Sequence, residues 1–185
     1  MAIYSESPQF GSSAPDFQLR GVDRRTYSLK DFAEARALVV VFMCNHCPYV
    51  VAVQKRINQL AQEFSPRGVQ LVAINSNDSI QYPDDSFEKM QIRAEEQGFV
   101  FPYLWDETQE VAQKYGAVCT PEFYVYERST GQWALRYRGR LDDSWKEETQ
   151  VQQRDLALAL ECILKGQPVS PDQKPSMGCS IKWKC

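Results

Sequence analysis

The residues best suited to chemistry are two cysteines and the only histidine, which lie together in Cys44-Asn45-His46-Cys47-Pro48. They directly follow the apolar run 37–43, which is typical of a buried strand, and precede the helical pattern that starts at Pro48. At a helix start, free backbone N–H groups and the helix dipole stabilise a thiolate, the nucleophile of disulfide exchange. We therefore predict a redox-active dithiol in which Cys44 attacks and Cys47 resolves the mixed disulfide.

His46 is expected to place a positive charge beside Cys44, which would lower the thiol pKa and make the couple more oxidising. The alternative is a solvated imidazole with little coupling, because exposed charges are screened. Cys44, His46 and Cys47 are also ligand types that zinc accepts, and Cys119 would be a fourth. Three ligands within four residues strain a tetrahedral site, so we rank zinc below redox chemistry.

Two further candidates flank Pro121. Glu122 is a candidate proton acceptor for Cys47, directly or through a water, although a glutamate at a strand start is more often solvated. Cys119 is an accessory thiol that could approach the dithiol, or equally a small buried hydrophobe. The sequence leaves both alternatives open.

The six cysteines do not require a disulfide framework, because a chain of 185 residues can bury a sizeable core. Cys162, beside Ile163, is expected to be an inert thiol. Cys179 and Cys185 lie in a Pro-containing C-terminal tail, where Cys179 could relay electrons to the dithiol. The alternative is a tail packed on the body through Ile181 and Trp183.

Composition limits the partners. The net charge of −3 arises from interspersed charges without a basic run, so we expect no nucleic-acid or membrane-surface partner. No apolar stretch approaches a membrane span, and residues 1–17 do not resemble a signal peptide, which favours a cytoplasmic location. No Gly-rich dinucleotide fingerprint is present, so we expect no cofactor. Protein or small-molecule disulfides and an external thiol reductant are the expected partners, and the protein is expected to be a monomer or dimer.

Periodicity predicts an α/β fold with a central mixed sheet flanked by helices. Strand 37–43, helix 48–64 and strand 69–74 form a βαβ unit, and Asp85 with Glu88 resembles a capping box. The other expected elements are an N-terminal strand extension at 14–19, a helical turn at 28–32, a helix after Asp106 with Gln109, a hairpin of 122–126 and 133–137, and a helix near 156–164. The prediction is one domain over 1–168 and a tail over 169–185.

The dithiol after a buried strand and Thr120-Pro121 before a later strand resemble the thioredoxin fold, which implies that Pro121 is cis and faces the dithiol. The resemblance is strongest to peroxiredoxin-related bacterial members of the alkyl hydroperoxide reductase and thiol-specific antioxidant superfamily. It is carried by these strings: Ala14-Pro15-Asp16-Phe17, Cys44-Asn45-His46-Cys47-Pro48-Tyr49-Val50, Asn75-Ser76-Asn77-Asp78, Tyr82-Pro83-Asp84-Asp85, Cys119-Thr120-Pro121 and 178–184.

Three residues differ from the patterns of thioredoxins and peroxiredoxins, and these differences bear on which reaction we expect. Leu38 stands where thioredoxins bury an aspartate, and Val40 and Cys44 stand where peroxiredoxins have a proline and a threonine. Efficient peroxide reduction is therefore in doubt. The leading prediction is a thiol–disulfide oxidoreductase using Cys44 and Cys47. The alternatives are a thiol peroxidase and a non-enzymatic redox-sensing or metal-holding module.

Overall fold

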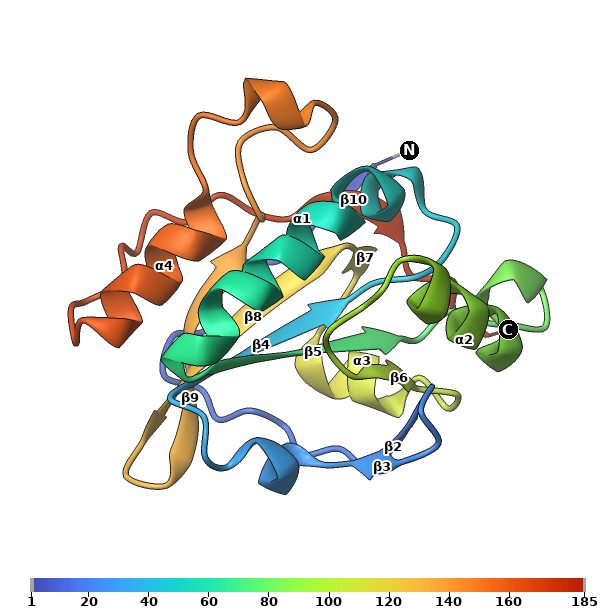
Figure 1. The fold of residues 1–185 in the computed structure, drawn as a ribbon, viewed down its shortest axis with the longest axis horizontal. Coiled ribbons are helices and arrows are strands. Elements are labelled where there is room, and N and C mark those ends of the chain that lie inside the picture. The colour runs from blue at the N-terminus through green and yellow to red at the C-terminus, as the bar shows by residue number, and fades with distance from the viewer. Residues whose placement is uncertain (1, 185) are drawn as a thin grey trace.

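A computed structural model describes residues 2–184 and shows alternating strands and helices along the chain (Figure 1). The strands are β1 (Ile3–Tyr4), β2 (Leu19–Gly21), β3 (Thr26–Tyr27), β4 (Ala37–Phe42), β5 (Val69–Asn75), β6 (Tyr103–Trp105), β7 (Cys119–Thr120), β8 (Glu122–Ser129), β9 (Gln132–Gly139) and β10 (Met177–Ser180). The helices are α1 (Pro48–Phe64), α2 (Phe87–Glu96), α3 (Glu110–Tyr115) and α4 (Asp155–Leu164), with 3-10 turns at Leu29–Phe32, Ser65–Arg67, Pro83–Asp85 and Glu148–Gln150.

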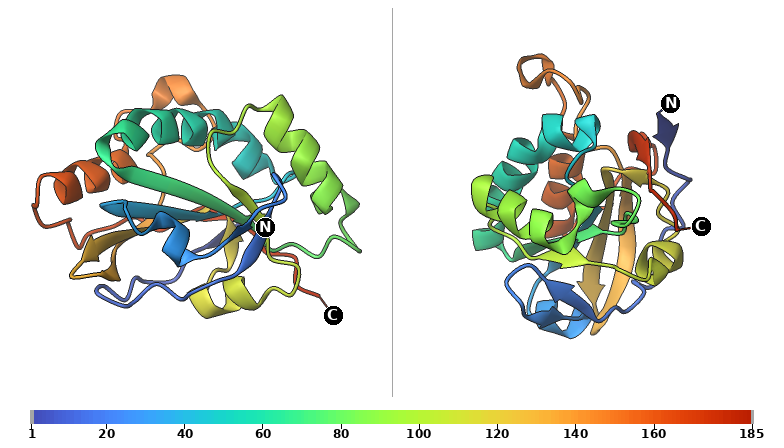
Figure 2. Two further views of the ribbon diagram at one scale, coloured as in Figure 1. Left: turned by 60° about the horizontal axis from the view of Figure 1, so that its bottom comes forward. Right: turned by 90° about the vertical axis from the view of Figure 1, so that its right-hand side faces the viewer.

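The strands form a large mixed sheet in the order β3-β2-β6-β5-β4-β8-β9 and a small sheet in the order β1-β10-β7. Strand β4 runs parallel to β5 and antiparallel to β8. Helices α1, α2 and α4 cover one face of the large sheet, and α3 covers the other (Figure 2). The predicted α/β fold with a central mixed sheet is confirmed.

Strand β4 is central because its side chains are apolar on both faces. Val39 and Val41 pack towards α1 and α4, whereas Leu38 and Val40 pack towards α3. All of these side chains are fully buried, as expected for a strand between two layers of helices. Leu38 thus fills the core and offers no proton acceptor.

Helix α1 begins and ends where the sequence predicts. Pro48 occupies the first helical position, where its missing N–H costs no hydrogen bond, and Cys47 is the N-cap residue. The helix passes into a 3-10 turn at Ser65, and Gly68 leaves it in the left-handed region with φ of 86°. This boundary places both cysteines between the end of β4 and the first turn of α1.

The predicted capping box at Asp85 is wrong. Ser86 is the N-cap of α2, and its hydroxyl accepts a hydrogen bond from the Lys89 backbone N–H. Asp85 instead turns inward and is fully buried. For α3 the predicted capping box is also wrong, because Gln109 is the N-cap residue, but Asp106 does accept hydrogen bonds from the backbone N–H groups of Val111 and Ala112 in the first turn.

The described part of the C-terminal segment is docked, as in the second of the two alternatives. Strand β10 inserts between β1 and β7, and Ile181 is buried against the core on the α3 side. Figure 2 shows this strand beside the N-terminal one, and Figure 1 shows β10 next to the start of α1. Trp183 remains partly exposed, and Cys185 lies outside the described residues.

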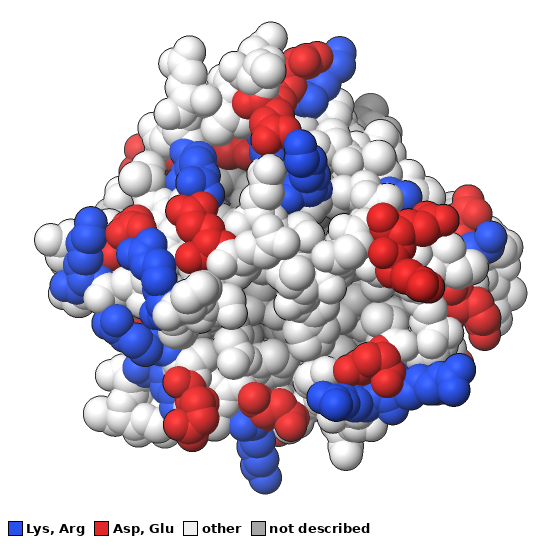
Figure 3. Space-filling model, in the orientation of Figure 1, with Lys and Arg blue, Asp and Glu red and all other residues white. Residues whose placement is uncertain are grey.

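Positive and negative side chains are interspersed over the face of the molecule shown in Figure 3. Among residues 2–184, no helix combines the length and apolar character that crossing a bilayer demands.

Candidate active site

The two cysteines lie together beneath the surface. Cys44 is 2% exposed and Cys47 is 0% exposed, and both are free thiols. A hydrogen bond between the two thiols shifts their pKa values in opposite directions. Thr120 contacts both sulfurs, with its hydroxyl 3.5 Å from Cys44 Sγ and its carbonyl oxygen 3.2 Å from Cys47 Sγ. The end of β4, the start of α1 and strand β7 therefore meet at one dithiol.

Electrostatics separate the two sulfurs. The hydrogen bond from Cys44 lowers the pKa of Cys47 against the effect of burial, and hydrogen bonds from Cys179 and from the Val50 backbone N–H lower it further. The same hydrogen bond, burial and the negative charge of Asp85 raise the pKa of Cys44. The pKa of Cys47, the N-cap residue of α1, therefore lies below that of Cys44, which is the reverse of the order expected from the sequence.

The Thr120-Pro121 peptide bond is cis, as the resemblance implied. It follows the short strand β7 and turns the chain into β8. This turn directs both polar groups of Thr120 at the sulfurs. Pro121 therefore borders the dithiol at the position expected for it.

His46 does not pair directly with a sulfur. Its Nδ1 lies 2.7 Å from a carboxylate oxygen of Asp85, whose side chain is fully buried, whereas the imidazole is 29% exposed. The ring stacks on Tyr82 with a centroid separation of 5.7 Å. A protonated His46 would thus be balanced by Asp85, so its charge cannot act alone on Cys44.

Asp85 is held by several donors. Its carboxylate accepts hydrogen bonds from the Asn45 backbone N–H and the Asn77 side-chain amide, both at 2.7 Å. The Asn75 amide contributes a longer one at 3.4 Å. The Asn45 side chain in turn accepts a hydrogen bond from the Tyr103 hydroxyl. These bonds fix the loop between the two cysteines to the ends of β5 and β6.

Glu122 is not brought to Cys47. Its carboxylate is fully buried and pairs with Arg138 at 2.7 Å, and it accepts hydrogen bonds from the backbone N–H groups of Val118 and Cys119. The Tyr124 hydroxyl donates to it as well. With both oxygens engaged, Glu122 is a structural anchor for β7 and β8, and the proton-acceptor role expected for it has no support in the geometry.

Cys119 also faces away from the dithiol. Successive side chains of a strand point to opposite faces, and Thr120 is the one that contacts the sulfurs. Cys119 Sγ lies 3.7 Å from a Glu122 oxygen. Burial and the charge of Glu122 raise the pKa of Cys119, so it is a protonated, buried thiol, as one of the two alternatives held.

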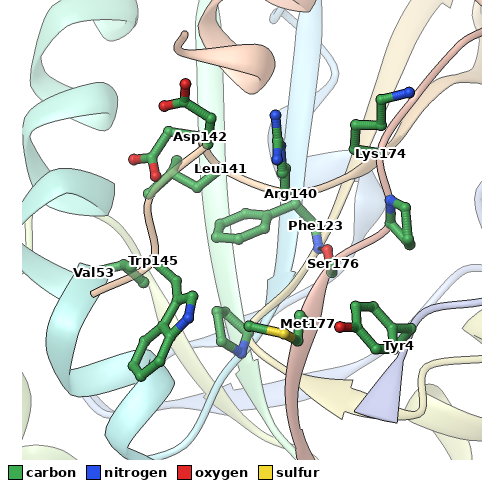
Figure 4. A pocket seen from close by; sticks show the side chains of 13 residues that line it. Tyr4, Val53, Phe123, Arg140, Leu141, Asp142, Trp145, Lys174, Ser176 and Met177 are labelled. Carbon is green, nitrogen blue, oxygen red and sulfur yellow. Dashed lines mark hydrogen bonds between the residues drawn. The ribbon is translucent and has the colours of Figure 1, made fainter. Parts of the chain in front are cut away.

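A pocket of about 280 Å³ opens beside Pro121. Figure 4 shows Trp145, Met177 and Tyr4 around one part of it and Asp142, Arg140 and Lys174 around another. Trp145 is 37% exposed and packs on Tyr49 of α1, with ring centroids 4.3 Å apart.

Helix α1 also positions the loop that carries Trp145. Buried Arg56 pairs with Asp142 and donates hydrogen bonds to the carbonyl oxygens of Ser144 and Trp145. The pocket wall is therefore fixed to the same helix that carries the dithiol at its start.

Comparison with known proteins agrees with this geometry. The profile of the AhpC/TSA family matches residues 10–138. This chain belongs to the AhpC/TSA family. A curated relative, the thiol-disulfide oxidoreductase ResA of Geobacillus thermodenitrificans (strain NG80-2), is 26% identical over 119 residues, which are 64% of each chain. The chain therefore matches less than two thirds of that relative's length.

Solved structures confirm the thioredoxin-like fold of this AhpC/TSA member. An uncharacterized conserved protein from Geobacillus kaustophilus superposes with a TM-score of 0.93 at 47% identity, covering 100% of this chain and 97% of the other. A thiol:disulfide interchange protein of the thioredoxin family from Chlorobium tepidum TLS gives a TM-score of 0.60 at 16% identity, over 86% and 98% of the two chains. The second similarity concerns the fold alone.

The sequence of this AhpC/TSA protein did not lead us to predict Asp85 or Thr120 as residues of the dithiol site. Asp85 lies in a string that carried the resemblance, but its spacing to Glu88 favoured a capping role. Ser86, a preferred N-cap residue type directly before Phe87, was the available signal that another residue caps α2. Thr120 could have been found from the Thr-Pro pair, since a residue before a cis proline lies beside its turn.

The described residues also place one set of metal-ligand types together. Atoms of Cys44, His46 and Asp85 lie within 4.8 Å of one another, with Asp85 in the place where the zinc alternative expected Cys47 and Cys119. The Asp85 carboxylate is already in contact with His46 Nδ1, and Cys47 interacts with Cys44 and Thr120. Contacts among the side chains themselves thus explain why Cys44, His46 and Asp85 lie together, and no metal ion is needed to explain it.

Proposed function

We propose that this AhpC/TSA protein is a thiol–disulfide oxidoreductase that uses Cys44 and Cys47 as its redox couple. The carrying observation is that Thr120, which precedes cis Pro121, contacts both sulfurs at the start of α1, with its hydroxyl 3.5 Å from Cys44 Sγ and its carbonyl oxygen 3.2 Å from Cys47 Sγ. Two free thiols held by the same residue are already close to the contact from which a disulfide forms. The name of the curated relative supports the same reaction class.

The hydrogen bond between the two thiols gives each cysteine a role. Transfer of the Cys44 proton to Cys47 leaves a Cys44 thiolate, which attacks a substrate disulfide and displaces one substrate thiolate. Cys47 then loses the proton and attacks Cys44 in the mixed disulfide. The second substrate thiolate departs, and the Cys44–Cys47 disulfide forms. An external thiol reductant returns two electrons to restore the dithiol.

The pocket beside Pro121 suggests the substrate class. Its walls include the apolar side chains of Trp145, Met177 and Val53, so it suits an apolar side chain next to the cysteine of a peptide disulfide. Trp145→Ala should lower kcat/KM for such a peptide about fivefold or more, equivalent to about 1 kcal/mol. A small disulfide without an apolar neighbour should react unchanged. Trp183→Ala, away from the pocket lining, is the matched control, and equal losses for both substrates would contradict the pocket assignment.

Reduction of insulin disulfides tests the activity. The wild type with a dithiol reductant should accelerate insulin precipitation, Cys44→Ser should be inactive, and Cys162→Ser on α4 should behave as the wild type. Activity that persists in Cys44→Ser would overturn the proposal.

A thiol peroxidase is the second candidate, favoured by the lowered pKa of Cys47, the position that corresponds to the peroxidatic cysteine. Stopped-flow oxidation by hydrogen peroxide separates the two activities. Oxidation faster than exchange with a peptide disulfide would reverse the ranking. Metal analysis of protein purified in its reduced form tests the metal-holding module, which zinc retention without insulin reduction would support.

A further inference from the structure

Strand β10 closes the site from the side of β7. It pairs antiparallel with β7 so that Cys179 lies opposite Thr120 and Ser180 lies opposite Cys119. The approach is tight at Gly178, where a Cβ atom would lie 1.9 Å from the Thr120 carbonyl oxygen. Only glycine fits there, so the strand lies directly against the backbone that contacts the dithiol.

Polar contacts hold the segment after β10 in place. The Lys182 backbone N–H donates to the Asn77 side chain, and the Lys182 carbonyl accepts from the Asp78 backbone N–H and the Gln109 side chain. The Ile181 backbone N–H donates to the Val118 carbonyl. Asn77 also binds Asp85, so the segment is tied to the network that surrounds the cysteines.

The result is a third sulfur at the dithiol. Cys179 packs against the core cluster that contains Cys44 and Cys47, and it lies opposite Thr120, whose carbonyl oxygen is 3.2 Å from Cys47 Sγ. Interactions with both Cys44 and Cys179 lower the pKa of Cys47, and these two cysteines come from different parts of the chain. The other described cysteines are placed differently, since Cys119 faces Glu122 and Cys162 lies on α4.

We propose that Cys179 is a third redox-active residue, which exchanges with the Cys44–Cys47 disulfide to form a Cys47–Cys179 disulfide. This inference rests on the proposed function. The Cys179 thiolate attacks Cys47 Sγ, the bond between Cys44 and Cys47 breaks, and Cys44 leaves with the electron pair and takes up the proton that Cys179 released. One disulfide is exchanged for another, so the step needs no oxidant or reductant.

The charge balance favours this order of events. In the reduced site, burial and the contact with Cys47 raise the pKa of Cys179 to about 11, which keeps it protonated. Once Cys47 is part of a disulfide its negative charge is lost, whereas the positive charge of Lys182 remains near Cys179. The third thiol thus becomes a better nucleophile only after the first disulfide has formed. The new bond would join β10 covalently to the start of α1 and leave Cys44 as a free thiol.

Oxidised glutathione and peptide mapping test the exchange. In Cys44→Ser, glutathione should first join Cys47 and then be displaced by Cys179, which gives a glutathione-free protein with a Cys47–Cys179 link. Trypsin separates Cys179 from Cys185 because Lys182 and Lys184 lie between them. The double variant Cys44→Ser/Cys179→Ser should keep its glutathione, and Cys44→Ser/Cys162→Ser should form the link at the same rate as Cys44→Ser.

The inference would be overturned if Cys44→Ser kept its glutathione for as long as Cys44→Ser/Cys179→Ser does. A disulfide between Cys47 and a cysteine other than Cys179 would also overturn it. The wild type under the same conditions separates the two proposals. If the wild type forms the Cys44–Cys47 disulfide but Cys44→Ser does not form the Cys47–Cys179 disulfide, Cys179 has no redox role and the proposed function stands. Failure of the wild type to form any disulfide removes both.

Discussion

His46 Nδ1 lies 2.7 Å from the carboxylate of Asp85, and this carboxylate is among the groups that raise the pKa of Cys44. The histidine of the Cys-x-x-Cys loop thus contacts a buried carboxylate beside the dithiol. Its partner comes from a distant loop, and the balance between the two charges sets the cost of a negative sulfur.

Removing the carboxylate charge should make the couple more oxidising. Asp85→Asn keeps the size of the side chain but removes a negative charge near Cys44 and Cys47. A thiolate then costs less free energy, so the reduced form is stabilised. Each tenfold gain in that stability raises the potential by about 30 mV. Titration against glutathione buffers measures the shift. Asp84→Asn, which changes an exposed neighbour, should leave the potential unchanged, and an unchanged or lower potential in Asp85→Asn would refute the assignment.

The thiolate on Cys47 should persist below the pH at which ordinary thiols protonate. Because hydrogen bonds lower the pKa of Cys47, its anion should absorb at 240 nm at pH values where a free cysteine, with a pKa of about 8.5, is neutral. Cys47→Ser should lose this absorbance. Cys44→Ala should move the titration to higher pH, because it removes the largest stabilising hydrogen bond. Identical titrations of the wild type and Cys47→Ser would show that Cys47 is not the anion.

Glu122 should matter for stability and not for proton transfer. Glu122→Gln leaves buried Arg138 without its partner, so the free energy of unfolding should fall by about 3–5 kcal/mol. The pH profile of disulfide exchange should be unchanged. Glu127→Gln, on the same strand, breaks a surface pair with Arg136 and should cost at most about 1 kcal/mol. A shifted pH profile in Glu122→Gln with normal stability would restore the proton-acceptor role.

Adding a methyl group to Gly178 should detach β10. The new Cβ would overlap the Thr120 carbonyl, so Gly178→Ala must move the strand away from β7. Cys47 should then be alkylated about tenfold faster or more at fixed pH. A tenfold increase corresponds to a decrease of about 1.4 kcal/mol in the free energy needed to separate β10 from the site. Ser180→Ala, in the same strand, serves as the control. Equal alkylation rates in the wild type and Gly178→Ala would show that β10 does not limit access.

Local sequence patterns were sufficient to predict strand β4 and helix α1, the two elements that flank the cysteines. The apolar run that forms β4 and the three- and four-residue spacing on α1 are properties of short segments, so they placed Cys44 and Cys47 between a strand and a helix. The pairing of Asp85 with the loop at Asn45 spans 40 residues, and no local period contains it.

The role of Glu122 depended on strand register. The hairpin pairs residues evenly from its turn to Tyr126 opposite Leu135, and then a bulge shifts the register so that Tyr124 faces Arg138. Without that bulge Arg138 would lie on the other face of the sheet from Glu122. The sequence predicts the hairpin but does not indicate the bulge, so the ion pair could not be foreseen.

The most direct test of the account is the thiol state of Cys44 and Cys47 across glutathione buffers of increasing oxidation, measured by quenching with an alkylating agent and peptide mass. The account predicts that both thiols disappear together in one two-electron transition, and that Cys44→Ser abolishes this transition while Cys162→Ser preserves it. Two cysteines that stay reduced throughout, or that acquire glutathione independently, would contradict it.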